Sequence, residues 1–400
     1  MKLLVLVEQH LVQLANGEIW TNDMVNALFW ERYLNVFEDI IVCGRIMKRN
    51  DNDSSGLAKS SREHVRFIPL PDFRGIGGIL KNIFKIRSIL KVAISQSDCI
   101  IYRAPSPISL VAYPLIRDSN KPFALELMNN PITQYSRESL NSWMQPLIQK
   151  VVTNQTREMC LKANGVAYVT EHVLQKLFPC RAMEKGDNVD RNYFQSHYST
   201  IRISQEDYKF VSMGNQLPET VVIVHSGKMN DNRKGQDILI RAVRLLKDAG
   251  YHVILRLMGD GVVRKKFEAM VQDLDLRDDV EFLGWKTGYN EVQNVLQTSH
   301  LFVFPSLGEG LPRSVIEAMA NGLITVASAV DGIRELLPDK LLVYSNTPQD
   351  FAKRIEEVIL NWTEFNQLRK QTFQKSKEYE NTILTKRRNE FYTNLKNCCK

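Results

Sequence analysis

Short runs of β-branched and aromatic residues alternate with longer stretches of helical apolar spacing along the whole chain. The short runs are typical of buried strands and the longer stretches of amphipathic helices, so the alternation predicts βαβ units and parallel sheets. In the first half we expect strands at 3–7, 40–42, 65–68, 99–102, 123–127 and 166–169. In the second half we expect them at 221–224, 253–258, 280–283, 301–304, 324–327 and 341–344.

The two series predict an α/β protein with two Rossmann-like, doubly wound domains, because 400 residues are too many for one ordinary core. A polar segment at 188–219 separates the series and is the candidate hinge. We expect the first domain to cover 1–208 and the second 209–377. Two such domains facing each other leave a cleft at the carboxyl ends of their strands, so functional residues are expected in loops that follow strands.

Composition narrows the class of protein. No apolar run approaches the length of a membrane span, and the start MKLLVLVEQH is too short and too soon acidic for a signal peptide, which favours a cytoplasmic protein. Six scattered cysteines without a C-x-x-C pair favour reduced, packing cysteines. The net charge of +7 is consistent with anionic ligands or an anionic membrane surface and is too diffuse to indicate nucleic acid.

The stretch FPSLGEGLPRSVIEAMANG at 304–322 contains two glutamates eight positions apart, Glu309 and Glu317. We expect a helix from Pro312 to Asn321, with Gly322 as its C-terminal stop. Glu309 then lies in the loop between strand and helix, and Glu317 lies inside the helix. Both side chains can face one cleft.

A carboxylate accepts two hydrogen bonds, so it suits a vicinal diol, and a sugar nucleotide offers diols at its ribose and its sugar. The free N–H groups at the start of the helix form an anion site between the two glutamates. A second interpretation is that Glu317 pairs with Arg313 at i,i+4 and that Glu309 is a surface charge. The spacing alone leaves both open.

Two stretches that follow strands help to interpret the pair of glutamates. Strand 221–224 leads into SGKMNDNRKGQDILIRAVRLL, and EGLPRSVIEAMANG follows strand 301–304. With these phrases, residues 221–345 resemble the nucleotide-sugar domain of GT-B glycosyltransferases of family 4, and the two glutamates match that family's E-x7-E motif. The first 200 residues resemble the family mainly in the order of their elements. The resemblance implies the GT-B fold, with a helix at about 378–400 that crosses back to the first domain.

The resemblance also implies roles for residues of the second domain. Glu309 would contact the donor sugar and Glu317 the ribose hydroxyls, with the amides of Gly310 and Leu311 near the sugar and phosphate. The remaining donor-binding candidates are in one loop after strand 221–224: Gly227, Lys228, Arg233 and Lys234. The family's diphosphate-binding arginine and lysine correspond to Lys228 and Lys234, and Arg233 is a possible helper because lysine lacks the bidentate grip of arginine. Glu309, Lys234 and Lys228 are therefore the catalytic candidates.

The acceptor side departs from the family pattern. The first loop has only Gly17 where many relatives have paired glycines, and ELMNNP supplies Asn129 where many have a histidine. Arg103 follows the fourth strand, where it would either face the acceptor or cap a helix. Gly17, Arg103 and Asn129 are the acceptor-side candidates. No catalytic base is apparent, and a retaining front-face reaction requires none.

These features predict a retaining hexosyltransferase that moves a sugar from a UDP- or GDP-sugar to a glycan or lipid-linked acceptor, in cell-surface polysaccharide biosynthesis. No cofactor or metal is expected, because the Asp-x-Asp matches at 51–53 and 273–275 do not follow strands of the cleft. Two alternatives stay open, a nucleotide-sugar-binding regulatory protein that has lost transfer and a nucleotide-sugar epimerase of the same fold.

A basic amphipathic stretch at 72–95 raises the question of membrane contact. Its apolar residues recur at helical spacing, and Lys81, Lys85 and Lys91 lie elsewhere on the helix. Such a helix either packs on its own sheet or lies on an anionic bilayer. The protein is therefore expected in the cytoplasm, possibly at the inner face of the membrane.

Overall fold

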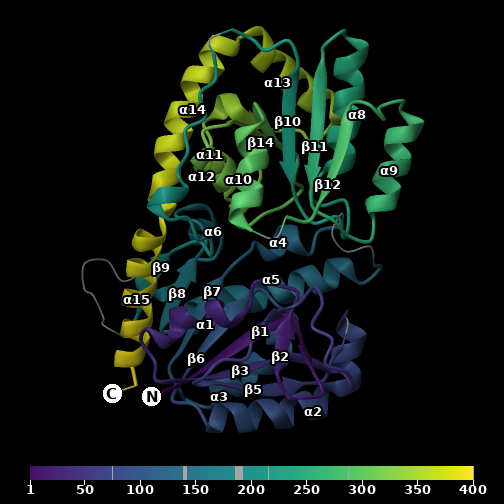
Figure 1. Cartoon of the computed structure of the whole chain (residues 1–400). Helices are drawn as coiled ribbons and strands as arrows, with labels where there is room; N and C mark the ends of the chain where they lie inside the picture. Colours follow the sequence, from purple (N-terminus) through teal and green to yellow (C-terminus); the bar gives the residue numbers. More distant parts are fainter. Residues whose placement is uncertain (74, 138–141, 185–191, 215, 287, 400) are drawn as a thin grey trace. The chain divides into compact units, whose positions relative to one another are not determined.

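The computed structural model describes residues 1–400 apart from 74, 138–141, 185–191, 215, 287 and 400, and the chain divides into two compact units (Figure 1). Unit 1 comprises residues 1–135, 143–198 and 384–400, and unit 2 comprises 136–142 and 199–383. Residues 199–208 join unit 2 because their backbone is anchored there: the Asp207 carbonyl accepts from Gln293 Nε2 at 2.7 Å. The expected hinge at 188–219 lies partly outside the described residues.

Unit 1 is built on a nine-stranded sheet whose parallel part has the order β5-β3-β1-β6-β7-β8-β9. Its strands are β1 (Lys2–Gln13), β2 (Ile19–Thr21), β3 (Asp39–Lys48), β4 (Ala58–Lys59), β5 (Val65–Leu70), β6 (Cys99–Ala104), β7 (Phe123–Leu127), β8 (Gly165–Tyr168) and β9 (Phe194–His197). Its helices are α1 (Ala27–Leu34), α2 (Gly75–Ser95), α3 (Ser109–Asp118), α4 (Pro131–Gln134), α5 (Gln145–Lys162), α6 (Val173–Leu177) and α7 (Arg181–Glu184). Figure 1 shows α2 and α3 along one face of the sheet and α1 on the other.

The apolar runs suit strands of this sheet because helices cover both of its faces. The residues of β6 and β7 are accordingly buried. All six predicted strands of this half are present. Three were not expected: β2 and β4 form a short antiparallel ribbon at the end of β1, and β9 has the polar sequence FQSH. Strand β1 is longer than predicted and has a bulge between Leu6 and His10, which places two extra residues opposite β3.

Unit 2 contains a six-stranded parallel sheet of order β12-β11-β10-β13-β14-β15. The strands are β10 (Val221–Ser226), β11 (Val253–Met258), β12 (Val280–Gly284), β13 (Leu301–Phe304), β14 (Ile324–Ser328) and β15 (Leu342–Val343). The helices are α8 (Gln236–Asp248), α9 (Arg264–Asp273), α10 (Tyr289–Gln297), α11 (Arg313–Ala320), α12 (Ile333–Leu336), α13 (Pro348–Leu360) and α14 (Trp362–Ser376), and short 3-10 turns lie at Gln205–Asp207, Asp339–Leu341 and Lys377–Tyr379. The predicted doubly wound α/β class is confirmed.

The chain ends in α15 (Asn381–Asn397), whose residues from 384 onward belong to unit 1. Its apolar face is buried there, and the Tyr392 ring lies 4.9 Å from the Tyr33 ring of α1. Among the described residues, no helix is both long and apolar enough to cross a membrane.

Candidate active site

The loops after β10 and β13 meet in unit 2 at the point where the strand order reverses, since β10 leads to β11 on one side and pairs with β13 on the other. This is the place where open parallel sheets bind ligands. A hydrogen bond joins the two loops: Leu307 N donates to the Arg233 carbonyl at 2.9 Å. Gly235 permits the close approach, since its φ is +72° and a Cβ atom there would lie 2.0 Å from the Pro305 carbonyl oxygen.

The two loops bring Lys234 and Glu309 together in an ion pair between Nζ and Oε1. Ser306 Oγ also donates to Glu309 Oε1 at 2.8 Å, and the Lys234 ammonium lies 5.5 Å from the centroid of the Phe304 ring. The side chain of Glu309 is 10% exposed and that of Lys234 30% exposed. The motif predicted both residues for one ligand, and the fold places them in contact although 75 positions separate them.

Glu317 lies in α11, which begins one residue later than predicted, with Pro312 at its N-cap position. Gly322 has a φ of +68° and follows the end of this helix, as predicted. Burial raises the pKa of the Glu317 carboxyl, and the positive charge of Arg313 opposes this. Within the described residues no ion pair joins Glu317 to Arg313, so the alternative of a simple surface pair receives no support.

Three further donor-side candidates lie in the β10–α8 loop and differ in their surroundings. The Gly227 N–H donates to the Met258 carbonyl at 3.0 Å. Lys228 is exposed. Arg233 is half-exposed and pairs with Asp231, with 2.8 Å between Nε and Oδ2. Arg233 therefore pairs within its own loop, whereas Lys234 pairs with Glu309 of the other loop.

The remaining candidates of unit 2 follow Glu309 directly. Leu311 is buried, and the Gly310 carbonyl accepts from Gly332 N at 3.1 Å. Glu309 N donates to Asp331 Oδ2 at 3.1 Å. Asp331 thus positions the loop of the first glutamate. Sequence reasoning did not find Asp331, although its place after β14, at the same edge of the sheet, was a usable signal.

His225, at the end of β10, is another residue that sequence reasoning missed. Its ring is buried and stacked on Phe304, with the centroids 5.4 Å apart, and Nδ1 donates to the Val303 carbonyl at 3.0 Å. Burial, helped by the charge of Lys234, lowers the pKa of His225 to about 4. The imidazole is therefore neutral near pH 7 and adds no positive charge beside Lys234.

The acceptor-side candidates belong to three different segments of unit 1. Gly17 is in the turn between β1 and β2, with a φ of +85°, and Asn129 is exposed after β7. Arg103 lies inside β6 and not after it. Its guanidinium is buried and pairs with Glu126, with 3.0 Å between Nε and Oε2. The expectation that Arg103 projects from the strand end is wrong, because the strand continues to Ala104 and covers it.

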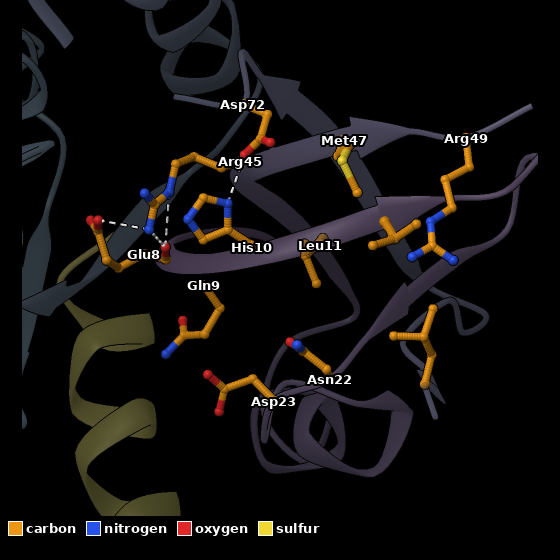
Figure 2. A pocket seen from close by; sticks show the side chains of 12 residues that line it. Glu8, Gln9, His10, Leu11, Asn22, Asp23, Arg45, Met47, Arg49 and Asp72 are labelled. Atoms are coloured by element: carbon orange, nitrogen blue, oxygen red, sulfur yellow. Dashed lines mark hydrogen bonds and ion pairs between the residues drawn. The ribbon is translucent and has the colours of Figure 1, made fainter. Parts of the chain in front are cut away.

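Unit 1 has a pocket of about 480 Å³ at the carboxyl ends of β1 and β3, shown in Figure 2. Glu8 lies in the bulge of β1 and pairs with Arg45 at 2.9 Å, between Oε1 and Nη2. Burial raises the pKa of Glu8 to about 7, and Arg45 opposes this. On the same side, His10 Nδ1 lies 2.6 Å from Asp72 Oδ1.

The opposite side of this pocket is formed by amide and carboxylate groups. In Figure 2 the ends of Gln9 and Asp23 point toward each other, next to Asn22. None of the three acceptor-side candidates lines this pocket. The bulge that creates it moves Glu8 out of the strand's alternation, so the pattern of β1 alone did not reveal it.

Comparisons with known proteins show which proteins this chain resembles. Residues 212–378 match the family model described as glycosyl transferases group 1. Protein CapJ of Staphylococcus aureus is 25% identical over 338 residues, which is 83% of this chain and 80% of that protein. The putative colanic acid biosynthesis glycosyltransferase WcaL of Escherichia coli is 31% identical over 149 residues, which is 35% of this chain and 36% of WcaL.

Two solved structures cover nearly the whole chain. Sucrose-phosphate synthase from Thermosynechococcus elongatus has a TM-score of 0.73 at 16% identity and covers 99% of both chains. Anabaena HepE in complex with UDP-glucose has a TM-score of 0.64 at 16% identity and covers 98% of both chains. At this identity the likeness establishes the fold alone. The chain has the GT-B fold, and together with the match of residues 212–378 these findings support a glycosyltransferase of group 1.

Proposed function

We propose that this protein is a retaining glycosyltransferase of the family 4 type, which transfers a sugar from a nucleotide diphosphate sugar to a glycan or lipid-linked acceptor in surface polysaccharide biosynthesis. The Lys234–Glu309 pair at the reversal point of the sheet carries the proposal. The group 1 match, the description of WcaL and the UDP-glucose bound to HepE support the substrate class.

Each residue of the Lys234–Glu309 pair binds a different part of the donor: Lys234 the diphosphate and Glu309 the sugar. A nucleotide diphosphate sugar offers oxygens with negative charge to Lys234 and hydroxyl groups to Glu309, so donor binding separates the two side chains and gives each a new partner. Lys234 then opposes the charge that develops on the departing diphosphate. Lys228, Gly310 and Leu311 complete the diphosphate and sugar contacts, and Glu317 accepts the ribose hydroxyls. In a front-face reaction the leaving phosphate takes the proton of the acceptor.

Glu309→Ala tests this assignment. Free nucleotide binds the variant nearly normally while turnover falls about 100-fold or more, since the partner of Glu309 is the sugar. Glu281→Ala is the control, because Glu281 is a paired, half-exposed carboxylate of the same sheet. Calorimetry and turnover with a panel of UDP- and GDP-sugars measure both properties. Equal losses of affinity for nucleotide and for nucleotide sugar contradict the assignment.

The same panel separates the alternatives when no acceptor is added. Slow nucleotide release suits the transferase, since water then takes the place of the acceptor. Interconversion of sugars without nucleotide release indicates an epimerase, and binding without chemistry indicates a regulatory protein.

We place the acceptor sugar in the pocket of unit 1, because its carboxylates (Glu8, Asp23 and Asp72) outnumber its arginines (Arg45 and Arg49) and amides lie beside them. Such a lining suits hydroxyl groups better than phosphate. Asp23→Ala then raises the KM for the acceptor and leaves nucleotide release without acceptor unchanged. Asp118→Ala is the control, since Asp118 is an exposed aspartate of unit 1 that lies outside the pocket. An unchanged KM contradicts the placement.

We also propose that α2 contacts an anionic bilayer. The helix buries Ile79, Ile86, Leu90 and Ile94, whereas Leu80, Phe84 at 86% and Val92 are exposed among its described side chains. Lys81, Lys85 and Lys91 are exposed on the same helix. Exposed apolar groups beside lysines are the features of interfacial helices. Phe84→Ser reduces co-sedimentation with vesicles that contain anionic lipid, and equal binding of both proteins to such vesicles contradicts this part of the proposal.

A further inference from the structure

Two thiols of unit 1 meet at the amino end of its parallel strands. Cys99 is the first residue of β6, and Cys399 follows the end of α15. Cys399 Sγ lies 3.9 Å from the Asp98 carbonyl oxygen, and the carbon of that carbonyl is bonded to the Cys99 nitrogen. A hydrogen bond joins the two thiols, and both are free. They are therefore neighbours, although Asp98 and Cys399 are 301 positions apart in the sequence.

The end of α15 is anchored in unit 1. Leu395 is buried, and Lys396 Nζ donates to the Val36 carbonyl at 2.8 Å. Cys399 Sγ also lies 3.5 Å from the Leu395 carbonyl oxygen. The backbone of Cys99 is held by the pairing of β6 with β1. Because both backbones are anchored, the two thiols stay within reach of each other in the folded protein.

The two thiols differ in access and in acidity. Cys99 is completely buried, whereas Cys399 is partly exposed. The hydrogen bond to Cys399, together with burial, raises the pKa of the Cys99 thiol. The same hydrogen bond lowers the pKa of the Cys399 thiol, against burial and the charge of Asp98. An accessible thiol of low pKa beside a second cysteine is the arrangement found in redox-sensitive pairs, since the thiolate is the nucleophile.

The other four cysteines, all in the described part of the chain, have different surroundings. Cys43, Cys160 and Cys180 are buried, and burial raises the pKa of each of these thiols. Cys398 is partly exposed, but its Sγ lies 4.0 Å from the Asn192 carbonyl oxygen, just before β9. Cys398 thus provides a matched control, a thiol of similar exposure directly beside Cys399 in the chain.

We propose that Cys99 and Cys399 form a reversible disulfide by exchange with a small-molecule disulfide (RSSR) of the glutathione type. The Cys399 thiolate attacks RSSR, which gives a mixed disulfide on Cys399 and releases one RS⁻. The Cys99 thiol then gives up its proton, and its sulfur attacks Cys399 Sγ and releases the second RS⁻. Two protein thiols are oxidised to one disulfide, and RSSR is reduced to two RSH, which take up the two protons.

The disulfide links β6 to the end of α15, a helix that begins in unit 2 and continues into unit 1. A cross-link between residues far apart in the sequence restricts the unfolded chain more than one that closes a short loop. Oxidation therefore secures the residues of α15 from 384 onward on unit 1 and stabilises the folded protein. This site does not depend on the proposed transferase function.

Peptide mapping tests the pairing on the unmodified protein. The protein is incubated with excess oxidised glutathione, the remaining thiols are alkylated, and trypsin is added. Cleavage places Cys99 in peptide 92–103 and both Cys398 and Cys399 in peptide 397–400. We expect the two peptides to be linked, with the alkyl group on Cys398 when the pair is fragmented in the mass spectrometer. The proposal is overturned if no linked pair is found, or if the link runs through Cys398.

Thermal unfolding of the whole protein measures the consequence. We expect the midpoint of the oxidised wild type to lie about 5 °C or more above that of the reduced form, and dithiothreitol to reverse the shift. Cys399→Ser abolishes the shift, whereas Cys398→Ser retains it. Equal midpoints of the two redox forms, or a shift that persists in Cys399→Ser, overturn the proposal. The peptide map of the wild type decides the pairing if a variant does not fold.

Discussion

Two of the carboxylate–cation pairs, one in each unit, differ mainly in their access to solvent. In unit 1 the side chains of Arg103 and Glu126 are 5% and 1% exposed, lie in adjacent strands and are surrounded by tyrosines. In unit 2 Lys234 and Glu309 are 30% and 10% exposed and lie in two loops at a sheet edge. A ligand can reach the second pair and exchange partners with it. The first pair has no such access and acts on stability.

This difference in solvent access indicates which charged residues are candidates for function. The sequence suggested Arg103 because it was expected to follow a strand, and Lys234 because it corresponds to the diphosphate-binding lysine of the family that the chain resembles. The strand of Arg103 continues past it, whereas Lys234 lies on a loop that Gly235 brings against the Pro305 backbone. A cation on a loop at the reversal point of the sheet is available to substrate, and one inside a central strand is not.

The largest expected effect is that of Glu126→Ala, which removes the carboxylate partner of the buried Arg103 guanidinium. We expect the free energy of unfolding to fall by about 3–5 kcal/mol, with nucleotide binding by the folded protein unchanged. Chemical denaturation measures the loss, and Glu38→Ala, at an exposed glutamate of unit 1, is the control. A loss below about 1 kcal/mol contradicts the interpretation.

The same residue predicts a dependence on pH. Burial acts to raise the pKa of Glu126, but Arg103 and the tyrosine hydroxyls outweigh it, so the pKa is lowered in the folded protein. The contribution of Glu126 to stability is therefore present above its ordinary pKa and is lost as the pH falls through the lowered value. Acidification should destabilise the wild type more than Glu126→Ala.

The fold could largely be predicted from the sequence because buried parallel strands are continuous apolar runs. All twelve expected strands are present, including β11 with its predicted bounds. The three that were missed lack that signal: β2 and β4 are very short, and β9 is polar and was assigned to the hinge. Their pairing depends on neighbouring strands, which local patterns do not encode.

The site was predictable only in part. The spacing of the motif identified Glu309 and Glu317, because strand, loop and helix are local features. The contact of Lys234 with Glu309 depends on two loops 75 positions apart, and the burial of Arg103 depends on Tyr392, whose bond to Glu126 spans 266 positions. No local pattern contains such information.

Lys234→Ala is the corresponding test for the pair in unit 2. Turnover should fall about 100- to 1,000-fold, since the proposed role of Lys234 is to oppose the charge of the departing diphosphate. Stability should change by less than about 1 kcal/mol, because the pair is partly exposed and Ser306 still donates to Glu309. Steady-state kinetics and thermal unfolding measure the two effects, and Lys265→Ala, at an exposed lysine of α9, is the control. If the variant loses stability in proportion to activity, Lys234 acts on stability, as the buried Arg103 does, and not on the reaction.

Glu317→Ala has a smaller expected effect, which falls on binding alone. The affinity for nucleotide and for nucleotide sugar should drop together by about 1–3 kcal/mol, because both carry the ribose. Burial raises the pKa of Glu317, so wild-type binding should weaken on acidification at a higher pH than an ordinary glutamate would cause, and the variant should lack this dependence. Calorimetry with the free nucleotide measures the loss, and an unchanged affinity rules out the ribose contact.

The smallest expected effect is that of metal removal. The departing nucleotide diphosphate carries negative charge that a counter-charge placed in advance must oppose. On the proposed mechanism Lys234, released from Glu309 by the donor, would supply that charge together with Lys228 and the N–H groups at the start of α11. Activity should therefore be unchanged in excess EDTA, and added magnesium should not rescue Lys234→Ala. If EDTA abolishes turnover and magnesium or manganese restores it, a bound cation supplies the charge. The Lys234–Glu309 pair would then have no proposed role in the chemistry, like the buried Arg103–Glu126 pair.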